Sequence, residues 1–444
     1  REVSVAILAQ DKWVHRGSGQ VCFRRVHVHM GNFLNQPVEL IRVQRGGCTA
    51  FRYAAAEMQG WRSGHEDCHA AASDGSRGSF WVLDGHCGAG AAKFTAPRLA
   101  QELMAALQKS SNALVNNEIV EVFESLDQRF KDEVRRDPKE DSGSTVIGIV
   151  VYKDLEGDYE AKLVNCGDSR AVLIRGPSEV EDSKASLDIT LPQEMVQAGN
   201  MPVAGWPVVV ESCDHKPNHP VERARIEAAG GYVMACEDPP RLDGNLAVSR
   251  SMGDFEYKQN EGLTASQQKV SCIPDIYKVT GLKPGSICLL ACDGIWDVMS
   301  TKEAATFVRS RLVDDPTADL GDISAALLKE CLSRGSRDNM TTMLIHFKDG
   351  SDVAERFPSD EMQNGHKMLD IVDEEVKTQY RKFLDREPVF PQEIKSCKVC
   401  GRWFANPSKC PCGTVTYCSK LCQKKDFKEH KPVCTAVAKQ SEAD

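Results

Sequence analysis

The feature of this chain that most constrains its fold is a dense cluster of cysteines near its C-terminal end. Seven of the 18 cysteines lie between Cys397 and Cys434, and the others are scattered between Cys22 and Cys331. The clustered residues form close pairs that also include a histidine: Cys397, Cys400, Cys410, Cys412, Cys418, Cys422, His430 and Cys434. Eight such ligands are enough for two tetrahedral Zn²⁺ sites. A segment of about 40 residues with few large apolar side chains cannot build a core alone, so we expect zinc to supply much of its folding free energy.

The distribution of the cysteines argues against a secreted protein held together by disulfides. Scattered thiols beside one dense cluster are typical of an intracellular protein, cytoplasmic or nuclear, that carries a metal-binding module. The chain has 444 residues and a net charge of −9, and this acidic balance argues against binding to DNA. No apolar run approaches the ~18–20 residues that span a bilayer, so we expect no transmembrane segment.

The chain divides into segments of different character, and its length suits two or three domains. Residues 1–50 have weak patterning and are predicted to be flexible. Within them Met30 is a plausible start of translation, which would make Gly31 an acceptor for N-myristoylation, although Asn35 replaces the usual Ser or Thr. An ordinary flexible terminus is the alternative. The other predicted segments are a globular domain over 51–349 with an irregular insertion at about 176–210, a charged helical connector over 350–394, the zinc module over 395–436 and a tail over 437–444.

Short β-rich runs alternate with helical patterns in the globular segment, as in the strand predicted over 145–152 and the helix over 117–136. Acidic residues stand beside glycine or at the ends of the predicted strands: Glu66, Asp67, Asp84, Asp168, Asp293, Asp297 and Asp338. One Asp-Gly pair is usually a turn. Repeated carboxylates at the ends of buried strands are costly unless positive charge neutralises them, and hard divalent cations do so with oxygen ligands. The pattern therefore favours a divalent metal site.

The motifs around these carboxylates resemble, in order along the chain, those of the type-2C family of metal-dependent protein serine/threonine phosphatases. The resemblance spans about 51–347 and is carried by eight stretches: Met58-Gln59-Gly60-Trp61-Arg62 with Glu66-Asp67, Leu83-Asp84-Gly85-His86, Ser142-Gly143-Ser144-Thr145, Asn165-Cys166-Gly167-Asp168-Ser169-Arg170-Ala171, Asp214-His215-Lys216-Pro217, Leu246-Ala247-Val248-Ser249-Arg250 with Gly253-Asp254, Ala291-Cys292-Asp293-Gly294-Ile295-Trp296-Asp297-Val298-Met299 and Ser336-Arg337-Asp338-Asn339-Met340.

This resemblance implies an α+β fold, a four-layer αββα sandwich in which two antiparallel sheets are flanked by helices. It implies that Asp84 bridges two Mg²⁺ or Mn²⁺ ions. Glu66 and the carbonyl of Gly85 would complete one ion, and Asp293 and Asp338 would hold the other. The positions of Asp168 and Asp297 match those that bind a third, weaker ion. Asp67 lies beside the site, where it would act through water or serve as a structural hydrogen-bond acceptor.

The chemistry implied is hydrolysis of phosphoserine and phosphothreonine by a water activated between two metal ions, without a covalent phosphoenzyme. Arg62 would clamp the phosphate with its planar fork of donors. His86, directly after the Asp84-Gly85 pair, is the candidate general acid that protonates the departing oxygen. Lys216 also matches a family position and is interpreted as a structural residue beside the site.

The C-terminal cluster resembles a MYND-type zinc finger, on Tyr417-Cys418-Ser419, Cys422-Gln423 and Asp426-Phe427 before His430. That resemblance implies interleaved ligands: one zinc would be held by Cys397, Cys400, Cys418 and Cys422, and the other by Cys410, Cys412, His430 and Cys434. Two departures are the short Cys410-Pro411-Cys412 spacing and Phe427 in place of the usual Trp. Such fingers bind proline-containing peptides, which is the partner implied here.

The interpretation that these features favour is an active, monomeric protein phosphatase whose finger recruits partners or phosphoprotein substrates. The competing hypothesis is a catalytically inactive scaffold, a pseudophosphatase that acts through the finger. The presence of the whole set of metal ligands argues against it, because an inactive relative would be expected to have lost at least one. A phosphatase of small molecules would use the same chemistry and stays open.

Overall fold

The computed structural model describes residues 33–110, 113–138, 141–181, 187–192, 205–234, 239–364, 371–384, 395–404, 408–410 and 412–434. The predicted flexibility of residues 1–32, the Gly31 acceptor and the tail over 437–444 lie outside these ranges. Among the described helices, none combines the length and the apolar character needed to cross a membrane.

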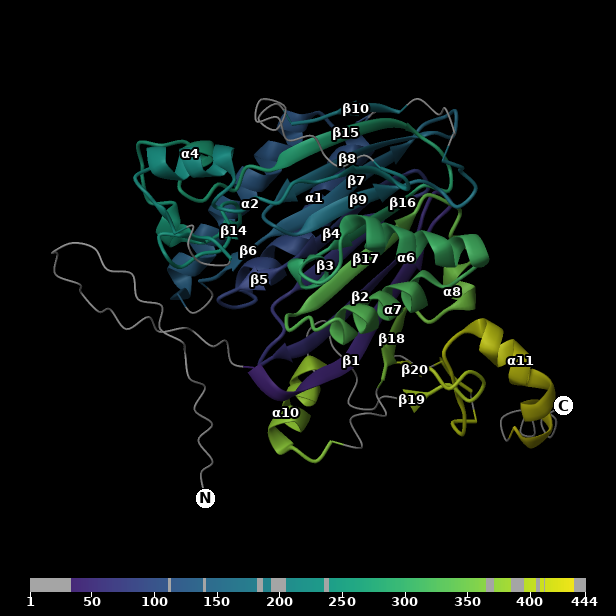
Figure 1. Ribbon diagram of the computed structural model, residues 1–444. Helices are drawn as coiled ribbons and strands as arrows, with labels where there is room; N and C mark the ends of the chain where they lie inside the picture. The colour runs from purple at the N-terminus through teal and green to yellow at the C-terminus, as the bar shows by residue number, and fades with distance from the viewer. Residues whose placement is uncertain are drawn as a thin grey trace, which may run out of the picture. The chain divides into compact units, whose positions relative to one another are not determined.

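Two antiparallel sheets form the centre of the fold (Figure 1). The first has nine strands in the order β11 (Val208–Glu211), β9 (Arg170–Ile174), β16 (Ile287–Ala291), β17 (Met340–His346), β2 (Arg52–Arg62), β1 (Phe33–Gly47), β18 (Asp360–Gln363), β20 (Trp403–Phe404) and β19 (Lys395–Ser396). The second has six strands in the order β10 (Asp188–Thr190), β15 (Asp275–Leu282), β8 (Tyr159–Cys166), β7 (Val146–Lys153), β4 (Arg77–Leu83) and β3 (Cys68–Ser73).

Helices cover the outer face of each sheet. Over the first sheet lie α6 (Thr301–Asp314) and α7 (Leu320–Ser333), and over the second lie α1 (Gly90–Lys109) and α2 (Asn116–Arg136). The other described helices are α4 (Pro220–Ala228), α5 (Asp293–Trp296), α8 (Val353–Arg356), α10 (Glu374–Leu384) and α11 (Lys420–His430). Sequence signals explain their ends. For example, α6 begins at a capping box in which Ser300 accepts from the Glu303 amide and the Glu303 carboxylate accepts from the Ser300 amide.

Three buried apolar clusters lie between these layers. One joins the inner faces of the two sheets and contains Phe51 and Phe80, whose ring centroids are 5.7 Å apart. A second lies between the first sheet and α6 and α7, and a third lies between the second sheet and α1 and α2. Strand β7 is buried along Val146–Val151, as expected for a strand covered on both faces. The predicted αββα sandwich is therefore confirmed.

The prediction that residues 1–50 are flexible is wrong from Phe33 onward. Residues Phe33–Gly47 form β1, which pairs with β2 on one side and with β18 on the other. The interpretation of 350–394 as a connector is likewise incomplete, since β18 belongs to the sheet. Strand β1 contains arginines, which are not expected in a buried strand unless they are paired. In the fold Arg42 lies 3.4 Å from Glu57, and Arg45 donates to Asp319 at 2.8 Å, so both are buried in ion pairs.

The C-terminal module contains two small hairpins and α11. One hairpin is β19–β20, and the other joins β21 (Ser408–Lys409) to β22 (Thr416–Tyr417). Strand β20 continues the first sheet, because Trp403 pairs with Met362 of β18. Arg402, just before β20, donates to the carboxylates of Asp322 and Glu361 at 2.7 and 2.9 Å. Part of the predicted 176–210 insertion is described, and its strands β10 and β11 lie at the outer edges of the two sheets.

Candidate active site

The predicted metal ligands come from five separate segments that meet at one edge of the two sheets. Asp84 directly follows β4, and Asp168 lies in the turn between β8 and β9. Asp293 begins α5 after β16, and Asp338 precedes β17. The pairs Met340–Met58, Ala291–Thr342 and Cys68–Leu83 show that these strand ends are neighbours. Glu66 and Asp67 lie between β2 and β3 at the same edge.

The electrostatics of this edge indicate a site that needs cations. Burial, together with the negative charges of Asp293, Asp67, Asp338 and Asp168, raises the pKa of Asp84 well above its usual value. Burial and the nearby charge of Asp168 likewise raise the pKa of Asp293 well above the ordinary range. A cluster of buried carboxylates is unfavourable in the ionised form unless a positive charge compensates it. Divalent cations with oxygen ligands are the group that fits this donor set.

Two basic side chains of the chain itself lie at the margin of the carboxylates. Arg62 donates from Nη2 to Asp338 Oδ2 at 2.5 Å, and its guanidinium lies 5.7 Å from the centre of the Phe33 ring. Lys216 donates from Nζ to Asp168 Oδ2. Although burial would lower the pKa of Lys216, the charge of Asp168 raises it. Lys216 was interpreted from the sequence as structural, and the structure shows that it pairs directly with a predicted ligand.

The remaining predicted residues take defined places at the same edge. Burial raises the pKa of Asp297, and the negative charge of Asp168 adds to this effect. Asp67 is fully buried and accepts from the Thr341 hydroxyl at 2.6 Å, which suits a structural acceptor. The Glu66 amide donates to the Asn339 side chain at 2.9 Å, which ties the loop before β3 to the segment before β17. Gly85 and His86 form the short strand β5.

His86 is held by an aspartate that sequence reasoning did not assign to the site. His86 Nε2 lies 2.8 Å from Asp254 Oδ2, and Ser251 Oγ donates to the same carboxylate at 2.5 Å. Burial alone would lower the pKa of His86, but the charge and hydrogen bond of Asp254, together with the charges of Asp168 and Glu66, raise it. A Cβ on Gly143 would lie 2.1 Å from His86 Nε2, so a larger residue there would displace the His86–Asp254 pair. The signal that could have found Asp254 was its place in the Gly253-Asp254 motif.

The C-terminal module brings its eight predicted ligands together as two separate sets. Cys397, Cys400, Cys418 and Cys422 form one set, and Cys410, Cys412, His430 and Cys434 form the other, with all ligand atoms of a set within 4.8 Å of one another. The Sγ atoms of Cys410 and Cys434 are 3.5 Å apart, and His430 Nε2 lies 3.3 Å from Cys412 Sγ. Among the described residues these are the two groups with such close spacing, and no three of the carboxylates meet it.

Comparison with known proteins agrees with both regions. The sequence profile of protein phosphatase 2C matches residues 51–340, and that of the MYND finger matches residues 397–434. Protein phosphatase 1B of Mus musculus is 34% identical over 345 residues, which cover 73% of this chain and 78% of the relative. The human protein phosphatase 1B is 33% identical over 345 residues, and these span 63% of its length. Protein phosphatase 1A of Bos taurus is 32% identical over 363 residues, 79% of this chain and 85% of the relative.

Solved structures show the same fold. A phosphatase from a pathogenic strain of Toxoplasma gondii superimposes with a TM-score of 0.54 at 26% identity, covering 69% of this chain and 95% of that one. A sex determining protein of C. elegans gives a TM-score of 0.53 at 20% identity over 69% and 67% of the two chains, which supports the fold alone. Fold and sequence together define a protein serine/threonine phosphatase. The chain belongs to the protein phosphatase 2C family and carries a C-terminal MYND finger.

Proposed function

We propose that this chain removes phosphate from phosphoserine and phosphothreonine in proteins with two divalent cations, Mg²⁺ or Mn²⁺, held by the carboxylates of the sheet edge. The observation that carries the proposal is the pair of partly buried carboxylates, Asp84 and Asp293, whose pKa values are raised by desolvation and by other carboxylates nearby. Such a cluster persists in a protein when cations compensate it.

The residues that would hold the cations are those that the resemblance to the family implies. Asp84, which is affected by the charges of four other carboxylates, would be shared between two ions. Glu66 and the Gly85 carbonyl would complete one ion, and Asp293 and Asp338 would complete the other. Asp168 and Asp297 would contribute to a third. When bound, the cations would supply the Lewis acidity that activates a water and neutralises the charge of the phosphoryl oxygens.

Arg62 would bind the substrate phosphate. Its side chain is 43% exposed, so it can reach an incoming group, and its contacts with Asp338 and Phe33 hold it at the mouth of the carboxylate cluster. One nitrogen is used by Asp338, which leaves other donors of the planar guanidinium for phosphoryl oxygens.

His86 would supply the proton that the departing serine or threonine oxygen needs. The charge of Asp254 keeps the imidazole in its protonated form to higher pH than an isolated histidine. The same contact orients the ring, because Asp254 lies 2.8 Å from Nε2 and is itself held by Ser251. Positioned proton donors of this kind typically contribute about 10²–10⁴-fold to rate.

The finger would act as a protein-interaction module whose two ligand sets each hold one zinc. A proline-containing peptide is the partner that its resemblance to other MYND fingers implies. The competing hypothesis of an inactive scaffold has no support from the described residues. In these, the predicted acid His86, the phosphate-binding Arg62 and the carboxylates all lie at one edge of the fold.

The proposal is tested by phosphate release from a phosphothreonine peptide. The full chain should release phosphate with Mn²⁺, and excess EDTA should abolish the reaction until Mn²⁺ is restored. Asp293→Asn should be inactive at every Mn²⁺ concentration. Asp314→Asn, an exposed aspartate at the end of α6, is the matched control and should behave as the wild type. Full activity of Asp293→Asn would refute the proposed site.

A further inference from the structure

Three consecutive residues of the Asp214-His215-Lys216 segment are bonded in turn to the loop that carries Asp168. Asp214 accepts two hydrogen bonds from Arg170, at 2.9 and 2.8 Å. His215 bonds to Gly167, and Lys216 pairs with Asp168 itself. The two segments are far apart in sequence and run alongside each other here. We call residues 214–216 the clamp.

His215 binds the Gly167 peptide from both sides. The His215 amide donates to the Gly167 carbonyl at 2.9 Å, and the Gly167 amide donates to His215 Nδ1 at 3.0 Å. Gly167 has a φ of +129°, and a Cβ there would lie 2.5 Å from the Cβ of Thr145. This turn therefore has a backbone conformation that few residues adopt, and it depends on the bonds that hold it.

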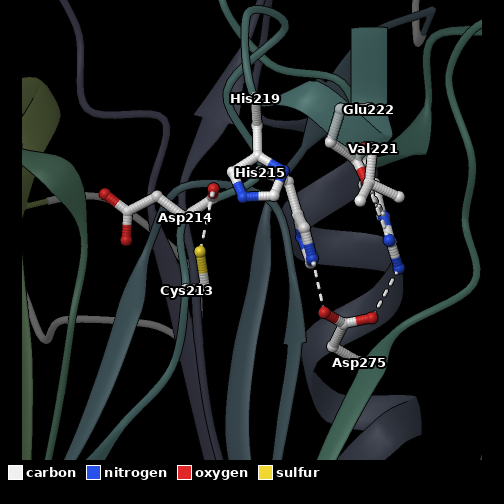
Figure 2. A pocket seen from close by; sticks show the side chains of 8 residues that line it. Cys213, Asp214, His215, His219, Val221, Glu222 and Asp275 are labelled. Carbon is white, nitrogen blue, oxygen red and sulfur yellow. Dashed lines mark hydrogen bonds and ion pairs between the residues drawn. The ribbon is translucent and has the colours of Figure 1, made fainter. Parts of the chain in front are cut away.

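Hydrogen bonds and buried charged side chains determine which nitrogen of the His215 ring carries the proton. To accept from Gly167, Nδ1 must carry no proton, so the proton lies on Nε2. Nε2 is 3.2 Å from Asp275 Oδ2, and Asp275 Oδ1 accepts from Arg250 at 2.8 Å. Arg250 in turn donates to Glu222 at 2.7 Å. Figure 2 shows His215 pointing into a small cavity toward Asp275, while the Asp214 carboxylate points out of it.

We propose that His215 is a positioning residue that orients Asp168 toward the carboxylates of the site, and that Lys216 is a cation of the chain itself that competes with metal for Asp168. The inference rests on the proposed function, since it concerns the predicted third cation. Asp168 is buried in the turn between β8 and β9, at the edge where the carboxylates meet, and Lys216 holds its carboxylate there. Lys216 pairs with Oδ2 of that carboxylate, so the ammonium group and a divalent ion would compete for its negative charge.

The two roles predict opposite effects on cation affinity. Loss of the ring contact to Gly167 frees the turn and should weaken the binding of Mn²⁺ at Asp168. Residues that orient metal ligands typically contribute about 10–100-fold to affinity. Loss of the Lys216 ammonium removes the competitor and should strengthen binding at the same place. Among the described residues, the hydrogen bonds of the clamp to ligand-carrying segments go to residues 167–170, so the His215 variants should act on this cation. The charge of Lys216 also reaches Asp293 and Asp297.

Calorimetry of Mn²⁺ binding separates the effect of His215 from that of Lys216. The full chain is used with its finger zinc in place and with no cation at the carboxylates. His215→Gln can reach Asp275 but offers no acceptor at the place of Nδ1, whereas His215→Asn keeps an oxygen there. We expect His215→Gln to weaken the weakest Mn²⁺ site by about tenfold or more, and His215→Asn to restore most of the affinity. Lys216→Met should tighten that site. His219→Gln, which lines the same cavity outside the clamp, is the control.

A spectroscopic measurement on the metal-free wild type keeps the inference testable if a variant fails to fold. Long-range ¹H–¹⁵N spectra of the histidine rings should show His215 protonated on Nε2 and bare on Nδ1. A proton on Nδ1 would overturn the clamp, as would equal losses of affinity in the Asn and Gln variants. If the wild type binds no Mn²⁺, the proposed function fails. If the wild type binds Mn²⁺ and turns over but no clamp variant changes the weakest site, the inference alone fails.

Discussion

The carboxylate site and the MYND finger both gather side chains that are predicted to bind metal, but they do so over very different lengths of chain. The carboxylates come from segments between Glu66 and Asp338, and two sheets bring them to one edge. The finger draws its ligands from Cys397–Cys434, and its small hairpins have little core besides the cysteines and Tyr417. In the first region the fold creates the site, whereas in the second the metal would create much of the fold.

This difference determines whether each region can hold like charges close together without a bound metal. The sheets of the phosphatase domain hold Asp84 and Asp293 close to like charges because large apolar clusters on both faces stabilise them. The finger has no apolar cluster of comparable size to stabilise it. Removing a ligand should therefore abolish chemistry in the first region and abolish structure in the second.

The largest effect is expected from Asp84→Asn. Loss of the shared ligand should reduce phosphate release by roughly a thousandfold or more, because the charge stabilisation supplied by bound cations amounts to several kcal/mol. The fold should be retained. In EDTA the melting temperature should match or exceed that of the wild type, since one buried negative charge has been removed. A variant that unfolds in EDTA would show that this site, too, is needed for folding.

A change of a finger ligand should have the opposite pattern. Cys418→Ser should lose zinc, measured by elemental analysis, and the amides of α11 should lose protection from hydrogen exchange. Release of phosphate from a short phosphopeptide should stay within about twofold of the wild type. Cys48→Ser, a half-buried thiol outside the finger, should retain its zinc. Loss of zinc from the Cys48 variant, or loss of turnover from the Cys418 variant, would contradict the separation of the two regions.

A smaller effect is expected within the carboxylate site when Asp254, the partner of the proposed general acid His86, is changed. Asp254 raises the pKa of His86, so Asp254→Asn should lower it. The acid must be protonated to act, and activity is lost as pH rises through this pKa. The alkaline limb of the kcat profile should therefore move to lower pH, with a loss of roughly tenfold at neutral pH. Glu256→Gln, an exposed neighbour, should leave the profile unchanged. An unshifted limb in Asp254→Asn would exclude His86 as the acid.

The smallest effect concerns the contact between the two regions. Arg402 bonds to Asp319, Asp322 and Glu361, where Arg45 also binds. Its side chain is 25% exposed, so Arg402→Ala should cost only about 1–2 kcal/mol. The amides of β18 and β20 should exchange faster, while turnover is preserved. Lys424→Ala on the exposed face of α11 should have no such effect. Unchanged exchange at β20 in Arg402→Ala would mean that this arginine does not secure the finger.

Sequence patterns predicted the elements whose local composition matches their burial. The run of apolar residues over 145–152 forms β7, and the apolar spacing over 117–136 forms α2. The two sets of finger residues that the resemblance to a MYND finger implies are the sets that the structure brings together. The roles of individual ligands stay predictions.

Features that depend on distant partners could not be read from the sequence. Strand β1 was not predicted, and the charges of its Arg42 and Arg45 are compensated by Glu57 and Asp319 only in the fold. Asp254 lies 168 positions from His86, so its role as a partner becomes visible when β5, β6 (Gly143–Ser144) and β14 (Met252–Gly253) come together. The same holds for Lys216 and Asp168.

The most direct test of the account is the release of phosphate from a phosphothreonine peptide by the full chain. Weakly bound cations are first removed by gel filtration. Elemental analysis then checks that the finger zinc remains. The account predicts no release from this protein and full release on addition of Mn²⁺. Release at the full rate with zinc alone would contradict the assignment of catalysis to the carboxylate edge.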